Sequence, residues 1–323
     1  MSGSEALELI NQAEKKLTSW SLFGGNKYEE AAELYIKAGN LFKLAKRSRW
    51  SLVAKEPLSP ISETSPIRNL PSSHSHPNLP SRCILGKEAG EAYGKAADLH
   101  LKSGNPDDAA QDFLNVSSCF KKVQPEAAID ALHRAIAHYK ERGSFSIAAR
   151  HQKGIAEIYE SDLIDLDKAS EAYEAAAELY IASDSPAQAN NCLLKVAHFQ
   201  AQLENYQKAI EVFESVAESC IDDRLTRYST KEYFLKAGLC VMSTGDLYGV
   251  HQKLEKYINM DVSFEGTREC QFLRAILDAV ENGDIDIFTQ KVVEYDQMTK
   301  LDNWKTTLLL RIKKSINDGP TLT

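Results

Sequence analysis

The feature that most constrains this chain is an alanine that recurs about every 20 residues. Each occurrence lies in a segment with apolar residues at i, i+3, i+4 and i+7, which is the spacing of one helix face. Helix breakers such as Gly104, Pro125 and Pro186 separate the segments. The recurring alanines are Ala89, Ala109, Ala128, Ala148, Ala169, Ala189 and Ala209. The pattern therefore predicts a helix and a short turn repeated many times over.

Helices of about 15 residues that repeat in this way form antiparallel pairs, and small alanines let neighbouring helices approach closely. We expect an all-α fold, a right-handed α-solenoid of antiparallel helix pairs like those of tetratricopeptide (TPR) repeats, over residues 1–220. The alternative is a helical bundle without a repeat. Beyond Cys220 five further helices with less regular spacing predict a C-terminal helical bundle with a short tail, residues 221–323.

One interval breaks the period, because Ala32 and Ala89 are 57 residues apart. Six of the ten prolines lie between Pro57 and Pro80, in a segment that is also rich in serine. Such a segment favours neither a continuous helix nor a packed core. We expect a flexible insertion at about residues 47–86, in the turn between the first two solenoid helices, which loop-closure entropy tolerates at small cost.

Charge and cysteine usage narrow the classes of function. A formal net charge of −8 argues against nucleic acid as a partner, because nucleic-acid binders carry a basic surplus. The six cysteines are scattered without metal-site spacing, which favours reduced thiols in the cytosol. The N-terminus lacks the apolar region of a secretory signal, and no apolar stretch is long enough to span a membrane. We expect a cytoplasmic protein.

The sequence offers little support for catalysis. It lacks a phosphate-binding loop of the G-x-x-x-x-G-K-[ST] type, H-E-x-x-H and G-x-S-x-G. The eight histidines are dispersed, so we expect no metal site and no cofactor. Solenoids bind through extended surfaces, and protein recognition is therefore the expected function.

Three surface features stand out. Trp20, Leu22 and Phe23 precede two glycines and favour either a loop that enters a membrane interface or a staple for the first helix. An acidic run covers residues 278–302, and such a run either binds a basic partner or is simply solvated. Cations on the repeat helices form either a basic stripe for an acidic helical partner or a scattered solvated surface. These cations are Arg150, Lys153, Lys195, Lys231 and Lys236.

Several long runs resemble a known family. The segments SLFGGNKYEEAAELYIKAGNLFKLAK, CLLKVAHFQAQLENYQKAIEVFE, KEYFLKAGLC and EYDQMTKLDNWKTTLLLRIKKSI are similar to those of the soluble NSF attachment proteins (SNAPs) of the alpha/beta type. The similarity covers essentially the whole chain except about residues 47–84. It involves many dozens of residues in order, and it is therefore highly specific.

The resemblance implies a non-enzymatic adaptor. Members of this family bind the assembled SNARE complex, a bundle of syntaxin, SNAP-25-like and synaptobrevin-like helices, and recruit and stimulate the hexameric AAA+ ATPase NSF. NSF then disassembles the bundle, which serves vesicle fusion and intracellular transport, including transport between the ER and the Golgi. The resemblance also implies peripheral contact with membranes.

The resemblance assigns roles to individual residues. The basic positions that meet the SNARE bundle match Lys46, Arg150, Lys195 and Lys231. The hydrophobic membrane loop matches Trp20, Leu22 and Phe23. The positions that contact NSF match Asp246, Asp278, Glu281 and Leu322. Two basic positions of the family are replaced here by Ser144 and Asn191, which either weakens SNARE binding or is compensated by Arg142 and Lys153.

Some alternatives stay open at this stage. The runner-up function is a general TPR-like scaffold for protein–protein interaction, and a third hypothesis is the helical subunit of a prenyltransferase-like enzyme. The segment 47–84 is either the product of an alternative exon or retained intron, or a regulatory loop. Ser59-Pro60 and Ser65-Pro66 are candidate proline-directed phosphorylation sites in that segment.

Overall fold

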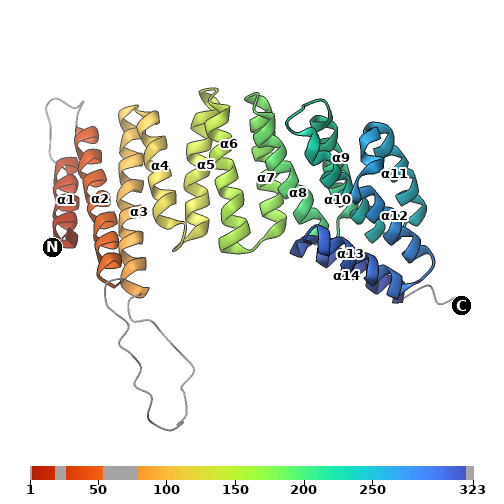
Figure 1. Ribbon diagram of the computed structural model, residues 1–323. Helices are drawn as coiled ribbons and strands as arrows, with labels where there is room; N and C mark the ends of the chain where they lie inside the picture. The colour runs from red at the N-terminus through yellow and green to blue at the C-terminus, as the bar shows by residue number, and fades with distance from the viewer. Residues whose placement is uncertain (1, 19–26, 54–78, 318–323) are drawn as a thin grey trace, which may run out of the picture. The chain divides into compact units, whose positions relative to one another are not determined.

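A computed structural model of the chain describes residues 2–18, 27–53 and 79–317. These residues contain fourteen α-helices and no β-strand, which confirms the all-α prediction (Figure 1). The chain divides into two compact units, Met1–Ile164 and Asp165–Thr323. Residues 1–220 and 221–323, the division expected from the repeat, stay a prediction.

The helices of unit 1 stand side by side and alternate in direction (Figure 1). They are α1 (Ser2–Thr18), α2 (Lys27–Val53), α3 (Leu79–Ser103), α4 (Pro106–Phe120), α5 (Pro125–Glu141) and α6 (Phe145–Ile158), with a π-helical turn at Tyr159–Leu163. Helices α2 and α3 extend farther into the expected insertion than predicted, to Val53 and from Leu79. The rest of that segment, residues 54–78, lies outside the described residues.

Unit 2 begins with the same alternation and ends differently. Its helices are α7 (Leu166–Ala182), α8 (Pro186–Gln202), α9 (Tyr206–Ile221), α10 (Thr230–Ser243), α11 (Leu247–Met260), α12 (Arg268–Glu281), α13 (Ile285–Met298) and α14 (Asn303–Asn317). Short 3-10 turns at Arg227–Ser229 and Val262–Gly266 precede α10 and α12. Helices α13 and α14 lie crosswise to the others, and α14 contacts α10 (Figure 1).

The recurring alanines form the contacts between helices. Ala32 and the seven alanines of the period are each at most 1% exposed. Glycines on the same faces allow still closer approach: a Cβ on Gly90 would lie 2.4 Å from the Phe120 ring, and one on Gly39 would lie 2.8 Å from the Tyr93 ring. A large side chain of one helix therefore rests on a small residue of the next.

The turns carry the residues that the sequence pattern predicted. Proline occupies the first helical position of α4, α5 and α8, where its missing N–H costs nothing. Gly104 and Gly143 adopt the left-handed conformation that ends a helix. Ile164 does the same at φ 54°, although it is β-branched and 79% exposed. Such a residue is strained in this conformation, by about 1–2 kcal/mol.

Ion pairs show that the odd-numbered helices form one layer in each unit. Lys95 of α3 pairs with Glu14 of α1 at 3.1 Å, and Arg134 of α5 pairs with Asp98 of α3 at 3.2 Å. In unit 2, Lys208 of α9 reaches a glutamate of α7 at 2.7 Å. Each pair joins helices two apart in the chain, so the even-numbered helices between them lie in a second layer; the crosswise α13 and α14 belong to neither layer.

Two glycines of α3 provide a matched test of the close helix approach. Gly90→Ala should destabilise the protein by about 1–3 kcal/mol, because the methyl group enters the space of the Phe120 ring. Gly94→Ala should stabilise it by about 0.5–1 kcal/mol, because the nearest side-chain atom is 4.0 Å away and alanine favours a helix. Urea denaturation of the two variants measures both changes; equal effects would contradict the packing described here.

Candidate functional site

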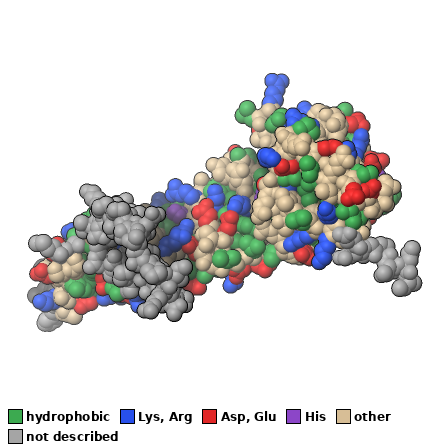
Figure 2. All heavy atoms as spheres, turned by 60° about the horizontal axis from the view of Figure 1, so that its bottom comes forward, with side chains coloured by type: hydrophobic (Ala, Val, Ile, Leu, Met, Phe, Trp, Pro, Cys, Tyr) green, Lys and Arg blue, Asp and Glu red, His purple; other side chains and the backbone are tan. Residues whose placement is uncertain are grey.

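The cations assigned to SNARE binding all lie on even-numbered helices. Lys46 is on α2 and Arg150 on α6 of unit 1, whereas Lys195 is on α8 and Lys231 on α10 of unit 2. Within each unit the two cations therefore belong to the same layer. On the face seen in Figure 2, Lys and Arg side chains are interspersed with Asp and Glu side chains wherever described residues are visible.

Lys46 is half-buried beside the first turns of α3. Its Nζ lies 3.1 Å from the position that a Cβ on Gly86 would occupy, and the carbonyl oxygen of Cys119 lies 3.5 Å from the same position. The ammonium group is thus close to the C-terminal end of α4, where a helix dipole favours a positive charge. Lys43, one turn earlier, lies over the Tyr93 ring at 4.5 Å.

Arg150 is exposed on α6. Ser144, which replaces a basic family position, is the N-cap of that helix and makes no side-chain cap hydrogen bond. The two residues named above as compensating cations are both engaged. Arg142 pairs with Asp107 of α4, and Lys153 pairs with Glu157 at 4.0 Å.

Lys195 and Lys236 differ in accessibility. The Nζ of Lys195 lies 5.6 Å from the centre of the Phe199 ring, and Asn191, the second lost basic position, is exposed one turn earlier. Lys236 is only 9% exposed, and burial lowers its pKa. Its ammonium group pairs with Glu232 at 3.5 Å. Lys236 therefore packs inside unit 2 and is not an open member of a basic stripe.

Lys231 is held by two neighbours. Its Nζ lies 3.4 Å from Glu269 Oε1 and donates a hydrogen bond to Tyr228 Oη at 3.3 Å. Burial lowers the pKa of Lys231, but the hydrogen bond to Tyr228 and the Glu269 carboxylate outweigh it, and the net pKa is raised. Sequence reasoning missed both partners. Tyr228 lies three residues before Lys231, in the 3-10 turn that precedes α10, whereas Glu269 is brought close by the packing of α12 against α10.

The acidic residues assigned to NSF binding lie on α11 and α12, which are in contact. Asp246 is the N-cap of α11 and accepts a hydrogen bond from the Gly249 backbone N–H at 2.9 Å. Asp278 and Glu281 are exposed in the last turn of α12. Glu281 pairs with His251 of α11 at 2.7 Å, which brings the end of α12 beside the start of α11. The three carboxylates therefore share one end of the helix pair.

Four of the assigned residues cannot be placed. Trp20, Leu22 and Phe23 lie in residues 19–26, and Leu322 lies in residues 318–323, all outside the described residues. Their assignments stay predictions.

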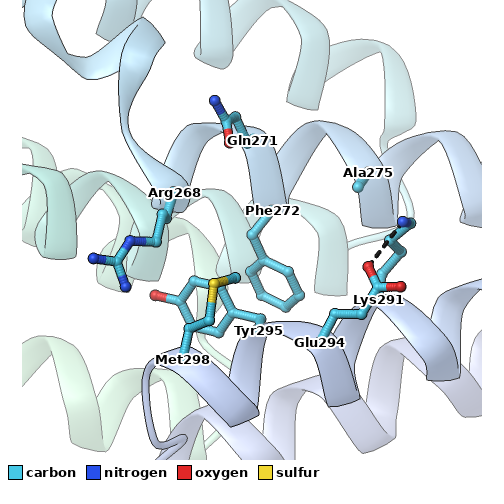
Figure 3. Close-up of a pocket in the computed structure, with 8 residues that line it drawn as sticks. All are labelled: Arg268, Gln271, Phe272, Ala275, Lys291, Glu294, Tyr295 and Met298. Atoms are coloured by element: carbon cyan, nitrogen blue, oxygen red, sulfur yellow. Dashed lines mark hydrogen bonds and ion pairs between the residues drawn. The ribbon is translucent and has the colours of Figure 1, made fainter.

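A shallow pocket of about 210 Å³ lies between α12 and α13 (Figure 3). Phe272 and Tyr295 stack there with ring centres 4.2 Å apart, and Lys291 pairs with Glu294 at 2.9 Å at the rim. Met298 lines the same pocket. Within the described ranges, no group of three or more His, Cys, Asp or Glu residues is arranged to hold a metal ion.

Helix α14 is fixed to α8 by its aromatic and basic side chains. Trp304 Nε1 donates a hydrogen bond to the His198 carbonyl oxygen at 3.1 Å, and Arg311 donates one to the Ala201 carbonyl oxygen at 3.1 Å. The Trp304 and His198 rings are 5.1 Å apart. Burial, and then the charge of Lys236, lower the pKa of His198 to about 3.

Comparison with known proteins decides the family. The family model described as "Soluble NSF attachment protein, SNAP" matches residues 4–51 and 85–317. The chain belongs to the soluble NSF attachment protein family. Residues 52–84 fall outside the match, and they lie within the insertion that the alanine period indicated.

Curated relatives of this family match the chain over nearly its full length. The alpha-soluble NSF attachment protein of Mus musculus is 40% identical over 97% of this chain and 95% of its own length. The beta protein of Bos taurus is also 40% identical, over 98% of this chain and 95% of its own. A probable vesicular-fusion protein sec17 homolog of Schizosaccharomyces pombe is 35% identical over 97% of this chain and 96% of its own.

Solved structures give a weaker likeness. A Rap protein complexed with competence and sporulation factor is 12% identical, covers 98% of each chain and has a TM-score of 0.39. That score is too low to support an argument about function. Among the helices that the structure describes, none combines the length and the apolar character needed to cross a membrane.

The low pKa of His198 predicts acid sensitivity. The folded protein keeps His198 neutral down to about pH 3, whereas the unfolded chain binds a proton below about 6.5. The contribution of neutral His198 to the free energy of unfolding is therefore fully present above pH 6.5 and is lost as the pH drops toward 3. Between pH 7 and 5, the loss of unfolding free energy should be smaller in His198→Gln than in the wild type.

The exposed His133 supplies the control. His133→Gln should lose as much stability on acidification as the wild type, as measured by urea denaturation at the two pH values. If His198→Gln shows the wild-type pH dependence, the neutral state of His198 is not what makes unit 2 sensitive to acid.

Proposed function

We propose that this chain is an adaptor that binds assembled SNARE complexes and recruits and stimulates NSF, as its family membership implies. The observation that supports the proposal most is the family match over residues 4–51 and 85–317, which includes all the assigned cations and all the described acidic positions. The adaptor has no catalytic activity of its own, because the ATPase activity resides in NSF. It works in the cytoplasm, in peripheral contact with membranes.

The distribution of charge supports an acidic partner on the even-numbered layer. In the odd-numbered layer, Lys95, Arg134, Lys208 and Lys253 each pair with an acid of the preceding odd-numbered helix. Those cations are already neutralised by neighbouring carboxylates. Arg150, by contrast, extends from the even-numbered layer as an exposed cation. We therefore assign the even-numbered layer to a bundle of acidic helices, with Arg150 as an exposed countercharge.

The acidic end of α11 and α12 supports a basic partner. Asp246, Asp278 and Glu281 are exposed, and the imidazole of His251 faces Glu281 at hydrogen-bond distance. Exposed charges at a rim act mainly on the rate of association and on its salt dependence. We assign this end of unit 2 to NSF.

The runner-up function, a general TPR-like scaffold, is less specific. A pull-down with assembled SNARE complex, NSF and a non-hydrolysable ATP analogue distinguishes the two. The adaptor retains NSF only when this protein and the SNARE complex are both present. A scaffold with other partners forms no such ternary complex, and that result would overturn the proposal.

Charge reversal on the even-numbered layer tests the SNARE surface. Arg150→Glu combined with Lys195→Glu should weaken binding to the assembled SNARE complex roughly tenfold or more, because two attractions become repulsions. Lys140→Glu together with Lys168→Glu makes the same charge change on odd-numbered helices and should have little effect. Bio-layer interferometry at low and physiological salt measures both. Equal losses in the two double variants would show that only net charge matters.

Neutralisation of the acidic end tests NSF recruitment. Asp278→Asn with Glu281→Gln should reduce NSF bound to the preformed complex of this protein with SNAREs, and binding to the SNARE complex itself should stay unchanged. Glu255→Gln with Glu265→Gln removes the same charge elsewhere on the same part of unit 2 and serves as control. Undiminished NSF recruitment by the first variant would refute the assignment of this end.

A further inference from the structure

The ammonium group of Lys231 is engaged by two neighbouring side chains within the protein. Its side chain is 26% exposed, and its Nζ lies 3.4 Å from Glu269 Oε1. The Tyr228 ring lies beneath the ammonium group, with its centre 4.3 Å from Nζ. Lys231 thus already has an acidic partner on the neighbouring helix α12.

Glu269 is one of the few buried carboxylates among the described residues, and its side chain is only 8% exposed. It lies in the first turn of α12, two residues after the N-cap Thr267, where the helix dipole favours a negative charge. Its second oxygen, Oε2, is buried and accepts no hydrogen bond from any described residue. Lys231 is the one cation within ion-pair distance of Glu269 in the part of the chain that the structure describes.

The other groups near this carboxylate do not replace Lys231. Tyr295 Oη, from α13, is buried in the same region and also lacks a described hydrogen-bond partner. Arg268 is adjacent in sequence, but it lines the α12–α13 pocket (Figure 3) and forms no ion pair with Glu269 among the described residues. Glu232, one residue after Lys231, pairs instead with Lys236 and Lys305.

In this geometry, binding of Lys231 to a partner costs free energy within the protein. If Lys231 turned fully toward an acidic partner, Glu269 would remain buried without a countercharge, which is strongly unfavourable. Lys231 must therefore either stay with Glu269 or share its charge between Glu269 and the partner. Arg150, which is exposed, is under no such constraint.

We propose that Glu269 competes with the acidic partner for Lys231 and thereby lowers the affinity of unit 2 for that partner. This inference rests on the proposed function, since it takes Lys231 as a contact to the SNARE bundle. Glu269 is a positioning residue and does not touch the partner. A lowered affinity suits an adaptor that must dissociate from the separated helices once the ATPase has acted.

Four variants test the proposal by binding to the assembled SNARE complex. Glu269→Gln keeps the shape and removes the competing charge, so binding should tighten about three- to tenfold, more at low salt than at high salt. Lys231→Gln should weaken binding. The double variant should bind the SNARE complex with the same affinity as Lys231→Gln alone. Glu265→Gln removes one charge from an exposed site nearby and should change binding only slightly.

The outcomes separate the inference from the proposed function. If Lys231→Gln binds as well as the wild type, Lys231 is not a SNARE contact, and the assignment of that residue fails. If Lys231→Gln weakens binding but Glu269→Gln does not tighten it, competition by Glu269 is refuted. Tightening that persists equally in the double variant also refutes it, because the effect then does not pass through Lys231.

A conservative variant keeps the proposal testable if Glu269→Gln does not fold. Glu269→Asp keeps the charge but withdraws it by one methylene group from Lys231, and it should tighten binding less than Glu269→Gln. Thermal unfolding of each variant shows whether unit 2 remains folded. If Glu269→Gln does not fold, the proposal is decided by Glu269→Asp, and binding no tighter than that of the wild type would overturn it.

Discussion

Close contact between helices at alanine and glycine positions is the constraint on which the structure depends. The eight alanines of the period are buried, and rings such as Phe120 rest directly on glycine backbone. Helices this close bring their flanking charges within ion-pair distance of the next helix in the same layer. The packing of small residues thereby also determines which charges are neutralised inside the protein and which remain available to partners.

The two layers use their charges differently. Cations of the odd-numbered helices hold neighbouring helices together, as Lys253 does through the buried Glu214 at 2.7 Å. The even-numbered helices carry the cations assigned to partner binding, but these are not equivalent: Arg150 is exposed, whereas Lys236 is buried against α14. A count of basic residues on a helix face therefore overstates the charge that a partner meets.

Much of the fold could be predicted from the sequence, because helix period, turn residues and small contact residues are local signals. Pro106 and Gly143 lie where the turns were expected, and Ala128 lies in a helix contact. The extension of α2 to Val53 was missed, since prolines nearby suggested an earlier end. The pairing of Lys231 with Glu269 could not be predicted, because α12 approaches α10 only through tertiary packing.

The interval between Val53 and Leu79 has a consequence for the evolution of this chain. Helices α2 and α3 pack against each other along their length, so the two ends of the interval are brought together by contacts that do not depend on what lies between. Chain length can change there at a small entropic cost. Sequence between α2 and α3 can therefore be gained, lost or exchanged for a reporter without disturbing the contacts between these helices.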